Sequence, residues 1–448
     1  MSESSQQLQG QKRYNLSWLL FAISAVFWVL NRYRSYNIAM AGYAFTSVIA
    51  FPGLFILLGQ EAKRQSDKRE KLIASGAGMI LLGYAQKILL FWVETLLGRT
   101  PAFHPFSTGG APWFFLVGGV FLLLAGAVRR KKWMKRWLLP LTVALALAFG
   151  AAKHAGDELC LARIVTYLPF FVLGWQLDLA RLKERSALIR NKILSLFILA
   201  GGAGVCLLYR SKWAALRGLI DGNKAYDGIS GIARIRLGPV YRLMFYLAAA
   251  VLLFALYCLV PERKLPLISA YGKRWKSGYF WFSVTVLLMT LPMGGKVSMK
   301  GAVFAGLLCL GGLLLSTTKW MNLLPDAILN GPERLQKEAP EERAPANGLR
   351  RGSFYQRHRW GIELTALYTG CFLVAAMGFV FPFLANGKSL IWSVDGLGQQ
   401  YPMILYTKRY LLGVFQNLVQ NGTLTLPQWD FTMGFGMAAG DNLNWEPF

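Results

Sequence analysis

Residues 38–59 read IAMAGYAFTSVIAFPGLFILLG, a run without a single charged side chain. A helix needs about 20 consecutive apolar residues to cross the hydrocarbon core of a bilayer, and this run is long enough to do so. Comparable apolar runs recur on both sides of it along the chain. The pattern predicts an all-α polytopic membrane protein.

The composition of the 448 residues supports this prediction. Hydrophobic residues make up 54% of the chain, charged residues only 16%, and the mean hydropathy is +0.37. A soluble domain is about a quarter charged, so the composition excludes a soluble enzyme and a disordered nucleic-acid-binding chain. The net charge of +27 fits basic cytoplasmic loops beside anionic lipid headgroups. The lipid bilayer, and not nucleic acid, is the expected partner.

The apolar runs predict eleven membrane spans. The first follows Lys12 and Arg13 without a small-residue cleavage site, which indicates a retained span and not a signal peptide. The predicted spans are approximately 16–30, 38–59, 72–97, 112–128, 137–152, 161–178, 193–209, 239–260, 278–293, 301–316 and 361–385.

The distribution of Lys and Arg between the loops predicts the orientation. With the N-terminus inside, the cytoplasmic segments carry roughly twice as many basic residues as the opposite loops. The densest basic runs, 63–69 and 129–132, then lie on the inner side. We therefore expect a multi-pass protein of the cytoplasmic membrane with its N-terminus inside and its C-terminal tail outside.

The chain divides into three predicted parts. Residues 1–320 hold ten of the spans and form a helical bundle. Residues 321–360 contain several prolines and mixed charges, which is typical of a flexible cytoplasmic linker. Residues 361–448 hold one further span and a long external tail.

Basic residues inside predicted spans are costly and therefore candidates for a binding site. Lys87 lies seven positions before Glu94 in the third span, while Arg163 and Arg242 open the sixth and the eighth. One interpretation is a polar cavity that binds an anionic carrier or a glycan. The alternative, stronger for the two arginines, is that the side chains extend to the membrane interface.

Histidines and cysteines provide few candidates for chemistry. His104 and His154 lie in predicted external loops, where each could be a general base or an ordinary solvated side chain. The five cysteines are widely spaced, form no CxxC motif and read as small buried hydrophobes. We expect no metal site and no tightly bound cofactor.

The external tail begins with a distinctive polar segment. Asp395 follows the interfacial Trp392, and Gln399 and Tyr401 come shortly after it. An external carboxylate in this position could deprotonate a hydroxyl acceptor, although Asp-Gly is also a common turn pair. Residues 403–420 then show helical periodicity, which predicts an amphipathic helix on the membrane surface.

Two stretches of this tail, NGKSLIWSVDGLGQQYP (386–402) and LPQWDFTMGFG (426–436), resemble the start of YfhO-type bacterial membrane proteins. That family is similar to C-type glycosyltransferases, which use a polyprenyl-phosphate sugar outside the membrane. The resemblance implies that Asp395 is a catalytic base, and Gln399 and Tyr401, which follow it closely, are candidate substrate-binding residues. It also implies that 361–448 are the beginning of a longer glycosyltransferase domain.

The first part resembles the membrane acyltransferase 3 family, in its sugar O-acetylase branch. The resemblance rests on FPGLFILLGQEAKR (51–64), GAPWFFLVGG (110–119), LARIVTYLPFFVLGWQL (161–177) and LVPERKLPLISAYGKR (259–274). The family's signature histidine would fall at Arg32, and its basic partner near Phe21, so both are absent here. The unit is therefore expected either to have kept the fold and lost the chemistry or to use His104.

Three functions remain open from the sequence. The first is glycosyl transfer to a cell-envelope glycan from a polyprenyl-phosphate sugar, with a degenerate acyltransferase-like unit. The second is O-acyl transfer, in which Lys87, Arg163 and Arg242 surround the path of an acyl donor. The third is a transporter or flippase of a lipid-linked sugar, which would move its cargo without changing covalent structure.

The first two functions predict different outcomes for the substitution Asp395→Asn. If glycosyl transfer depends on this carboxylate, the substitution should lower transfer of labelled sugar to the glycan by about 10²–10⁴-fold, the contribution of a general base. Acetylation of the same glycan should stay unchanged. A variant with unchanged sugar transfer would remove Asp395 from the reaction.

Overall fold

The computed structural model describes most of the first three quarters of the chain and a few segments of the rest. The chain divides into a first compact unit, residues 1–372, and a second, residues 373–448, and each is described by itself. The described residues are 3–66, 68–97, 110–128, 134–151, 160–177, 182, 186, 188–230, 237–263, 265–288, 299–338, 376, 380, 401–421, 429–430 and 437–438.

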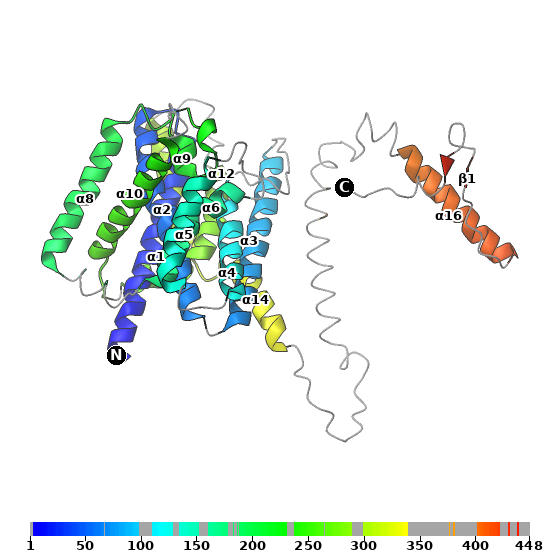
Figure 1. The fold of residues 1–448 in the computed structure, drawn as a ribbon, viewed down its shortest axis with the longest axis horizontal. Coiled ribbons are helices and arrows are strands. Elements are labelled where there is room, and N and C mark those ends of the chain that lie inside the picture. The colour runs from blue at the N-terminus through cyan, green and yellow to red at the C-terminus, as the bar shows by residue number, and fades with distance from the viewer. Residues whose placement is uncertain are drawn as a thin grey trace, which may run out of the picture. The chain divides into compact units, whose positions relative to one another are not determined.

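The described part of the first unit is helical (Figure 1). Each of the ten ranges predicted as spans within 1–320 overlaps a helix in the described residues. The helices are α1 (Glu3–Arg32), α2 (Asn37–Arg64), α3 (Arg69–Leu96), α4 (Trp113–Ala127), α5 (Met134–Phe149), α6 (Leu161–Gln176), α8 (Ile189–Leu208), α9 (Arg217–Asp221), the 3₁₀ turn η1 (Tyr226–Gly228), α10 (Gly238–Leu259), α11 (Pro266–Lys273), α12 (Trp275–Leu288), α13 (Met299–Ser316) and α14 (Leu323–Glu338).

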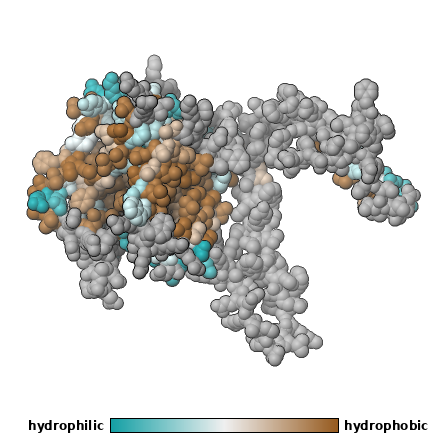
Figure 2. All heavy atoms as spheres, viewed as in Figure 1, coloured by the Kyte–Doolittle hydropathy of each residue, from teal (hydrophilic) through white to brown (hydrophobic). Residues whose placement is uncertain are grey.

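Within the described residues, five helices are long and apolar enough to cross a membrane: Gln11–Arg32, Asn37–Arg64, Arg69–Leu96, Ile189–Leu208 and Gly238–Leu259. Three shorter apolar helices, Trp113–Ala127, Trp137–Phe149 and Gly306–Ser316, accompany them. This set fits a multi-pass membrane protein, whereas the count of ten spans and their orientation stay predictions. Hydrophobic side chains cover much of the visible face of the first unit (Figure 2).

Helix α8 illustrates how this apolar surface is arranged. It lies beside α10 at one edge of the unit (Figure 1), and only 6% of its most apolar window is buried by protein. Exposed side chains along it include Ile193, Leu196 and Phe197. Contact of so extensive an apolar helix face with lipid is favourable, whereas its exposure to water would cost free energy.

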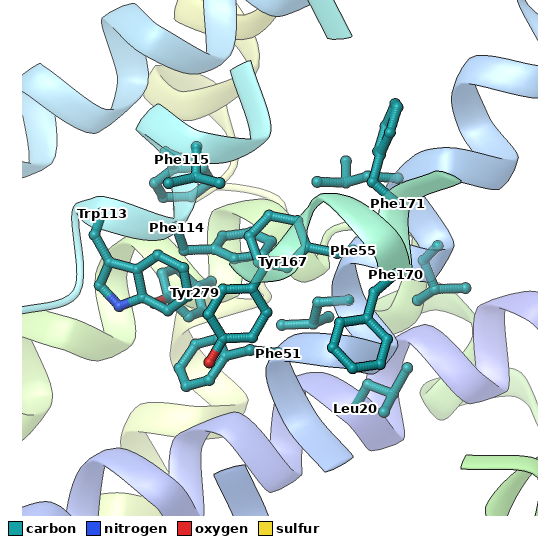
Figure 3. Packing of buried hydrophobic residues seen from close by; sticks show 14 of the residues in the cluster. Leu20, Phe51, Phe55, Trp113, Phe114, Phe115, Tyr167, Phe170, Phe171 and Tyr279 are labelled. Atoms are coloured by element: carbon teal, nitrogen blue, oxygen red, sulfur yellow. The ribbon is translucent and has the colours of Figure 1, made fainter. Parts of the chain in front are cut away.

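Helix α2 lies at the centre of the first unit, with 78% of its most apolar window buried. It contacts α1, α4, α6, α8 and α10. Its rings Phe51 and Phe55 pack with Phe114 of α4 and Tyr167 of α6 in an aromatic layer (Figure 3). Offset and edge-to-face ring pairs of this kind add to the free energy gained from burial.

The contact between α2 and α6 depends on two glycines. A Cβ atom at Gly59 would overlap the carbonyl oxygen of Phe171, and one at Gly174 would overlap that of Ile56. The two backbones therefore touch where neither helix carries a side chain. Small residues at a crossing allow this close approach between membrane helices.

The segment predicted as a flexible linker begins with a helix. Residues 323–338 form α14, which packs on α3, and the backbone of Leu329 fills the space where Gly78 lacks a side chain. The sequence did not reveal this helix because Pro325 and Pro332 suggested a linker, whereas in the structure α14 runs through both positions. Residues 339–360 lie outside the described part of the chain.

Little of the second unit is described. The predicted helix 403–420 is confirmed as α16 (Tyr401–Asn421), and two short strands, β1 (Trp429–Asp430) and β2 (Met437–Ala438), pair antiparallel. The exposed side chains of α16 include Leu411, Phe415 and Val419. The predicted span 361–385 lies outside the described residues except for positions 376 and 380.

The glycine crossing can be tested by a matched pair of substitutions. Gly174→Val should lower the free energy of unfolding by about 1–3 kcal/mol, because the added side chain overpacks the backbone contact with α2. Gly201→Val in α8 is the control, since a Cβ atom there meets nothing within 4 Å. Thermal unfolding in detergent compares the two, and equal stabilities would contradict the close crossing.

Candidate functional site

A polar cavity lies at the end of the bundle that the charge pattern predicts to be external. It is bounded by the C-terminal end of α1, the N-terminal halves of α2 and α6, and helix α9, and its volume is about 230 Å³. Its lining comprises Phe27, Trp28, Asn31, Arg34, Tyr43, Ser47, Phe51, Gly110, Trp113, Arg163, Tyr167, Arg217, Ile220, Asp221 and Asn223. We call it the outer cavity.

The chemical centre of the outer cavity is Asp221, at the C-terminal end of α9. The Tyr43 hydroxyl donates a hydrogen bond to its Oδ1 atom, and the Arg217 Nε atom donates to Oδ2 at 3.2 Å. Burial raises the pKa of the Asp221 carboxyl, and the hydrogen bonds and positive charges around it offset only part of this effect. Such a carboxyl holds its proton at a higher pH than an exposed aspartate does.

Side chains from the neighbouring helices fix the backbone around Asp221. Arg242 Nη1 donates to the Leu219 carbonyl oxygen at 2.7 Å, and the Tyr167 hydroxyl donates to that of Ile220 at 3.2 Å. Gly222 adopts a left-handed conformation (φ +66°), which ends α9 and packs against Thr166. The last carbonyl groups of α9 thus find partners on α6 and α10, as buried helix ends require.

One wall of the outer cavity is aromatic. The Arg163 guanidinium lies over the Trp113 ring, 4.9 Å from its centroid, and the Tyr167 ring stacks on Trp113 at 5.3 Å. Tyr167 and Trp113 are seen together in Figure 3. A cation over the face of a tryptophan gains electrostatic attraction, which helps to hold the buried Arg163 in place.

Three further polar side chains line the cavity: Asn31 and Arg34, near the C-terminal end of α1, and Asn223, which follows Gly222. Arg34 Nη1 donates to Asn31 Oδ1 at 2.9 Å. The Oδ1 atom of Asn223 is buried and accepts no hydrogen bond from the described protein atoms. Because buried polar atoms are normally paired, Asn223 is suited to receive a hydrogen bond from a ligand.

The structure brings together only part of the site expected from sequence. Arg163 lines the outer cavity, whereas Arg242 is buried behind α9 and holds its backbone. Lys87 is partly buried on α3 and lines neither this cavity nor the second one described below. His104, His154, Asp395 and Gln399 lie outside the described residues, and Tyr401 begins α16 with its side chain undescribed.

Sequence reasoning missed Tyr43, Asp221 and Asn223. Tyr43 and Asp221 are 178 positions apart, so no local spacing relates them. The only local signal was the stretch Asp221-Gly222-Asn223, which has the composition of an ordinary turn.

A second cavity lies at the opposite ends of α1 and α2, on the side predicted to be cytoplasmic, with a volume of about 520 Å³. Its described lining includes six basic residues, Arg13, Arg64, Lys71, Lys273, Arg274 and Lys276, and two acidic ones, Glu61 and Asp326. Lys276 Nζ and Glu61 Oε1 form an ion pair at 3.0 Å. We call this the inner cavity, and its excess of positive charge favours an anionic ligand.

Comparison with known proteins adds no relative to this picture. No family model, no curated protein and no solved structure matches the chain. The described residues also contain no group of three or more His, Cys, Asp or Glu side chains that could hold a metal ion. The function must therefore be argued from the geometry of the two cavities.

The raised pKa of Asp221 predicts a pH-dependent difference between the native protein and the Asp221→Asn variant. As the pH rises above about 4, the unfolded chain loses this proton before the folded protein does. The stability of the native protein relative to the variant should therefore fall with rising pH and level off above the pKa of the folded state. Thermal unfolding of both proteins between pH 4 and 8 measures this, and a pH-independent difference would contradict the raised pKa.

Proposed function

We propose that the protein is a membrane-embedded transferase that modifies cell-envelope glycans, and that its first unit transfers an acyl group to a glycan hydroxyl. The observation that carries this proposal is the buried carboxylate of Asp221 in the outer cavity, beside Tyr43 and an aromatic wall. Cavities with aromatic walls and a few convergent polar groups are typical binding sites for small ligands.

The position of the cavity agrees with the resemblance to the acyltransferase 3 family. That resemblance implies a catalytic histidine at Arg32, and the neighbouring residues Asn31 and Arg34 line the outer cavity. Asp221 thus lies in the cavity beside which a histidine is expected, and its carboxylate can accept a proton in place of the imidazole. In this proposal the protein can catalyse acyl transfer although the histidine is absent.

In the proposed reaction, Asp221 takes the proton of the acceptor hydroxyl as its oxygen attacks the carbonyl carbon of an acyl thioester. The bond between carbonyl carbon and sulfur breaks, and the departing thiolate receives the proton from Asp221. The Tyr43 hydroxyl and Arg217 hold the carboxylate in place through hydrogen bonds to its two oxygens. Correct placement of the base is a large part of the rate that such a group supplies.

The inner cavity supports a phosphate-bearing acyl donor. Its six basic side chains offer charge-assisted hydrogen bonds to phosphate oxygens. Along α2 the order is Phe51, Phe55 and then Glu61, so the aromatic layer separates the two cavities. Delivery of an acyl group from the inner side therefore requires these rings to move.

Glycosyl transfer by the second unit remains a separate proposal, because Asp395 lies outside the described residues. Transport of a lipid-linked sugar is the third possibility carried over from the sequence. An assay that follows labelled acetyl and sugar groups in membranes separates all three functions.

The decisive substitution is Asp221→Asn. Transfer of a labelled acetyl group from an acyl thioester to glycan, measured in membranes that contain the full chain, should fall by about 10²–10⁴-fold because the base is lost. Tyr43→Phe should cause a smaller loss, since the carboxylate stays and loses one hydrogen bond. Asp227→Asn, which changes an exposed acid in the same loop, is the matched control and should have no effect.

Full transfer by the Asp221→Asn variant would refute the role of this carboxylate. Label that crosses the bilayer without becoming covalently attached would favour the transporter. Label transferred from a polyprenyl-phosphate sugar, and lost in Asp395→Asn, would favour the glycosyltransferase.

A further inference from the structure

The lining of the outer cavity contains three guanidinium groups. Among its described residues, Arg34, Arg163 and Arg217 are basic and Asp221 is the single acidic residue. Arg217 is paired with Asp221, and Arg34 is bonded to the neutral amide of Asn31. The lining thus carries more positive than negative charge. A neutral sugar bound there would leave this excess positive charge unbalanced.

The three guanidiniums occupy different depths. Arg163 is 7% exposed and lies over Trp113, whereas Arg34 is exposed at the rim. Each guanidinium carries five N–H donors in a planar fork, which matches the oxygens of a carboxylate or a phosphate. Together the three guanidiniums form an array of donors on the lining that also holds Asp221.

The size of the cavity limits the ligand. Sites for drug-sized molecules have volumes of about 300–1,000 Å³, so a cavity of about 230 Å³ accommodates one small unit. The buried Asn223 Oδ1 atom and the Asp221 carboxylate accept hydrogen bonds from hydroxyl groups. The site therefore combines hydroxyl acceptors, an aromatic wall and anion-binding guanidiniums around a single small unit.

From this combination we infer that the acceptor recognised in the outer cavity is a sugar residue bearing an anionic substituent, a carboxylate or a phosphate. The anionic group pairs with Arg34 and Arg163, and a neighbouring hydroxyl reaches Asp221. This inference rests on the proposed function for the reaction, but it concerns binding and can be tested without a donor. Arg34 and Arg163 are then the residues that set specificity, while Asp221 carries the chemistry.

A set of matched monosaccharides tests the inference. Galacturonate and galactose 6-phosphate differ from galactose only at carbon 6, and the binding of each to the full chain in detergent is measured by calorimetry or ligand-observed NMR. One of the two anionic sugars should bind about tenfold more tightly than galactose, the gain from one charge-assisted hydrogen bond. Which of the two binds identifies a carboxylate or a phosphate as the recognised group.

Substitutions at the guanidiniums provide the second arm. Arg34→Gln, at the exposed rim, should reduce the preference for the anionic sugar over galactose. Arg163→Gln should reduce the preference further, and Arg163→Lys should restore part of it because the charge returns. Arg210→Gln, which removes an exposed arginine from the same loop region as Arg217, is the control and should leave the preference intact.

Equal affinity for galactose and both anionic sugars would overturn the inference, and so would a variant that weakens all three alike. An absence of binding by every probe would overturn it as well. These outcomes differ from failure of the proposed reaction. If Asp221→Asn abolishes acetyl transfer but no anionic preference exists, the function stands and the inference falls.

Discussion

The rest of the structure depends on the direct backbone contact between α2 and α6. Because Gly59 and Gly174 carry no side chains, the two helices approach closely enough for the rings of Phe51, Phe55 and Tyr167 to interlock above them. Helix α2 also supplies residues to both cavities, Tyr43 to the outer one and Glu61 to the inner one. Van der Waals contact and interhelical hydrogen bonds drive association in lipid, so a close crossing of this kind has a larger role than it would have in water.

The polar groups near the outer cavity are explained by the burial of the C-terminal end of α9. A helix end buried against apolar helices leaves carbonyl groups that water cannot reach, and the free energy cost of leaving them unpaired is high. Arg242 and Tyr167 satisfy those of Leu219 and Ile220, and in doing so they hold Asp221 in one orientation. The hydrogen bonds that stabilise the end of α9 thus also position the Asp221 carboxylate.

Much of the helical framework could be predicted from the sequence, and the reason is physical. A long apolar run has few stable conformations in a bilayer, so the ranges predicted between 16 and 316 coincide with helices. The amphipathic periodicity of 403–420 likewise indicated α16. Helix α14 was missed because its prolines suggested a linker, although Pro325 lies in its first turn, where no backbone N–H partner is needed.

The candidate site was less predictable. Arg163 could be singled out because a charge within an apolar span is costly, and it does line the outer cavity. Asp221 lies in a polar loop, where an acidic residue is unremarkable, and its importance comes from the distant Tyr43 that contacts it. Which distant residues meet depends on the chain topology, and a single sequence does not reveal that topology.

The aromatic layer between the two cavities has an electrical consequence. Residues Phe51 and Glu61 are ten positions apart on α2, which corresponds to about 15 Å along a helix, half the thickness of the hydrocarbon core. If the first unit spans the bilayer as proposed and both cavities hold water, a large part of the membrane voltage falls across the stretch between them. The energy of one elementary charge changes by about 2.3 kcal/mol per 100 mV across the full voltage drop. In the proposed arrangement, a charged group that moved between the two cavities would experience much of this voltage over a few helical turns, and the voltage would favour one direction of movement.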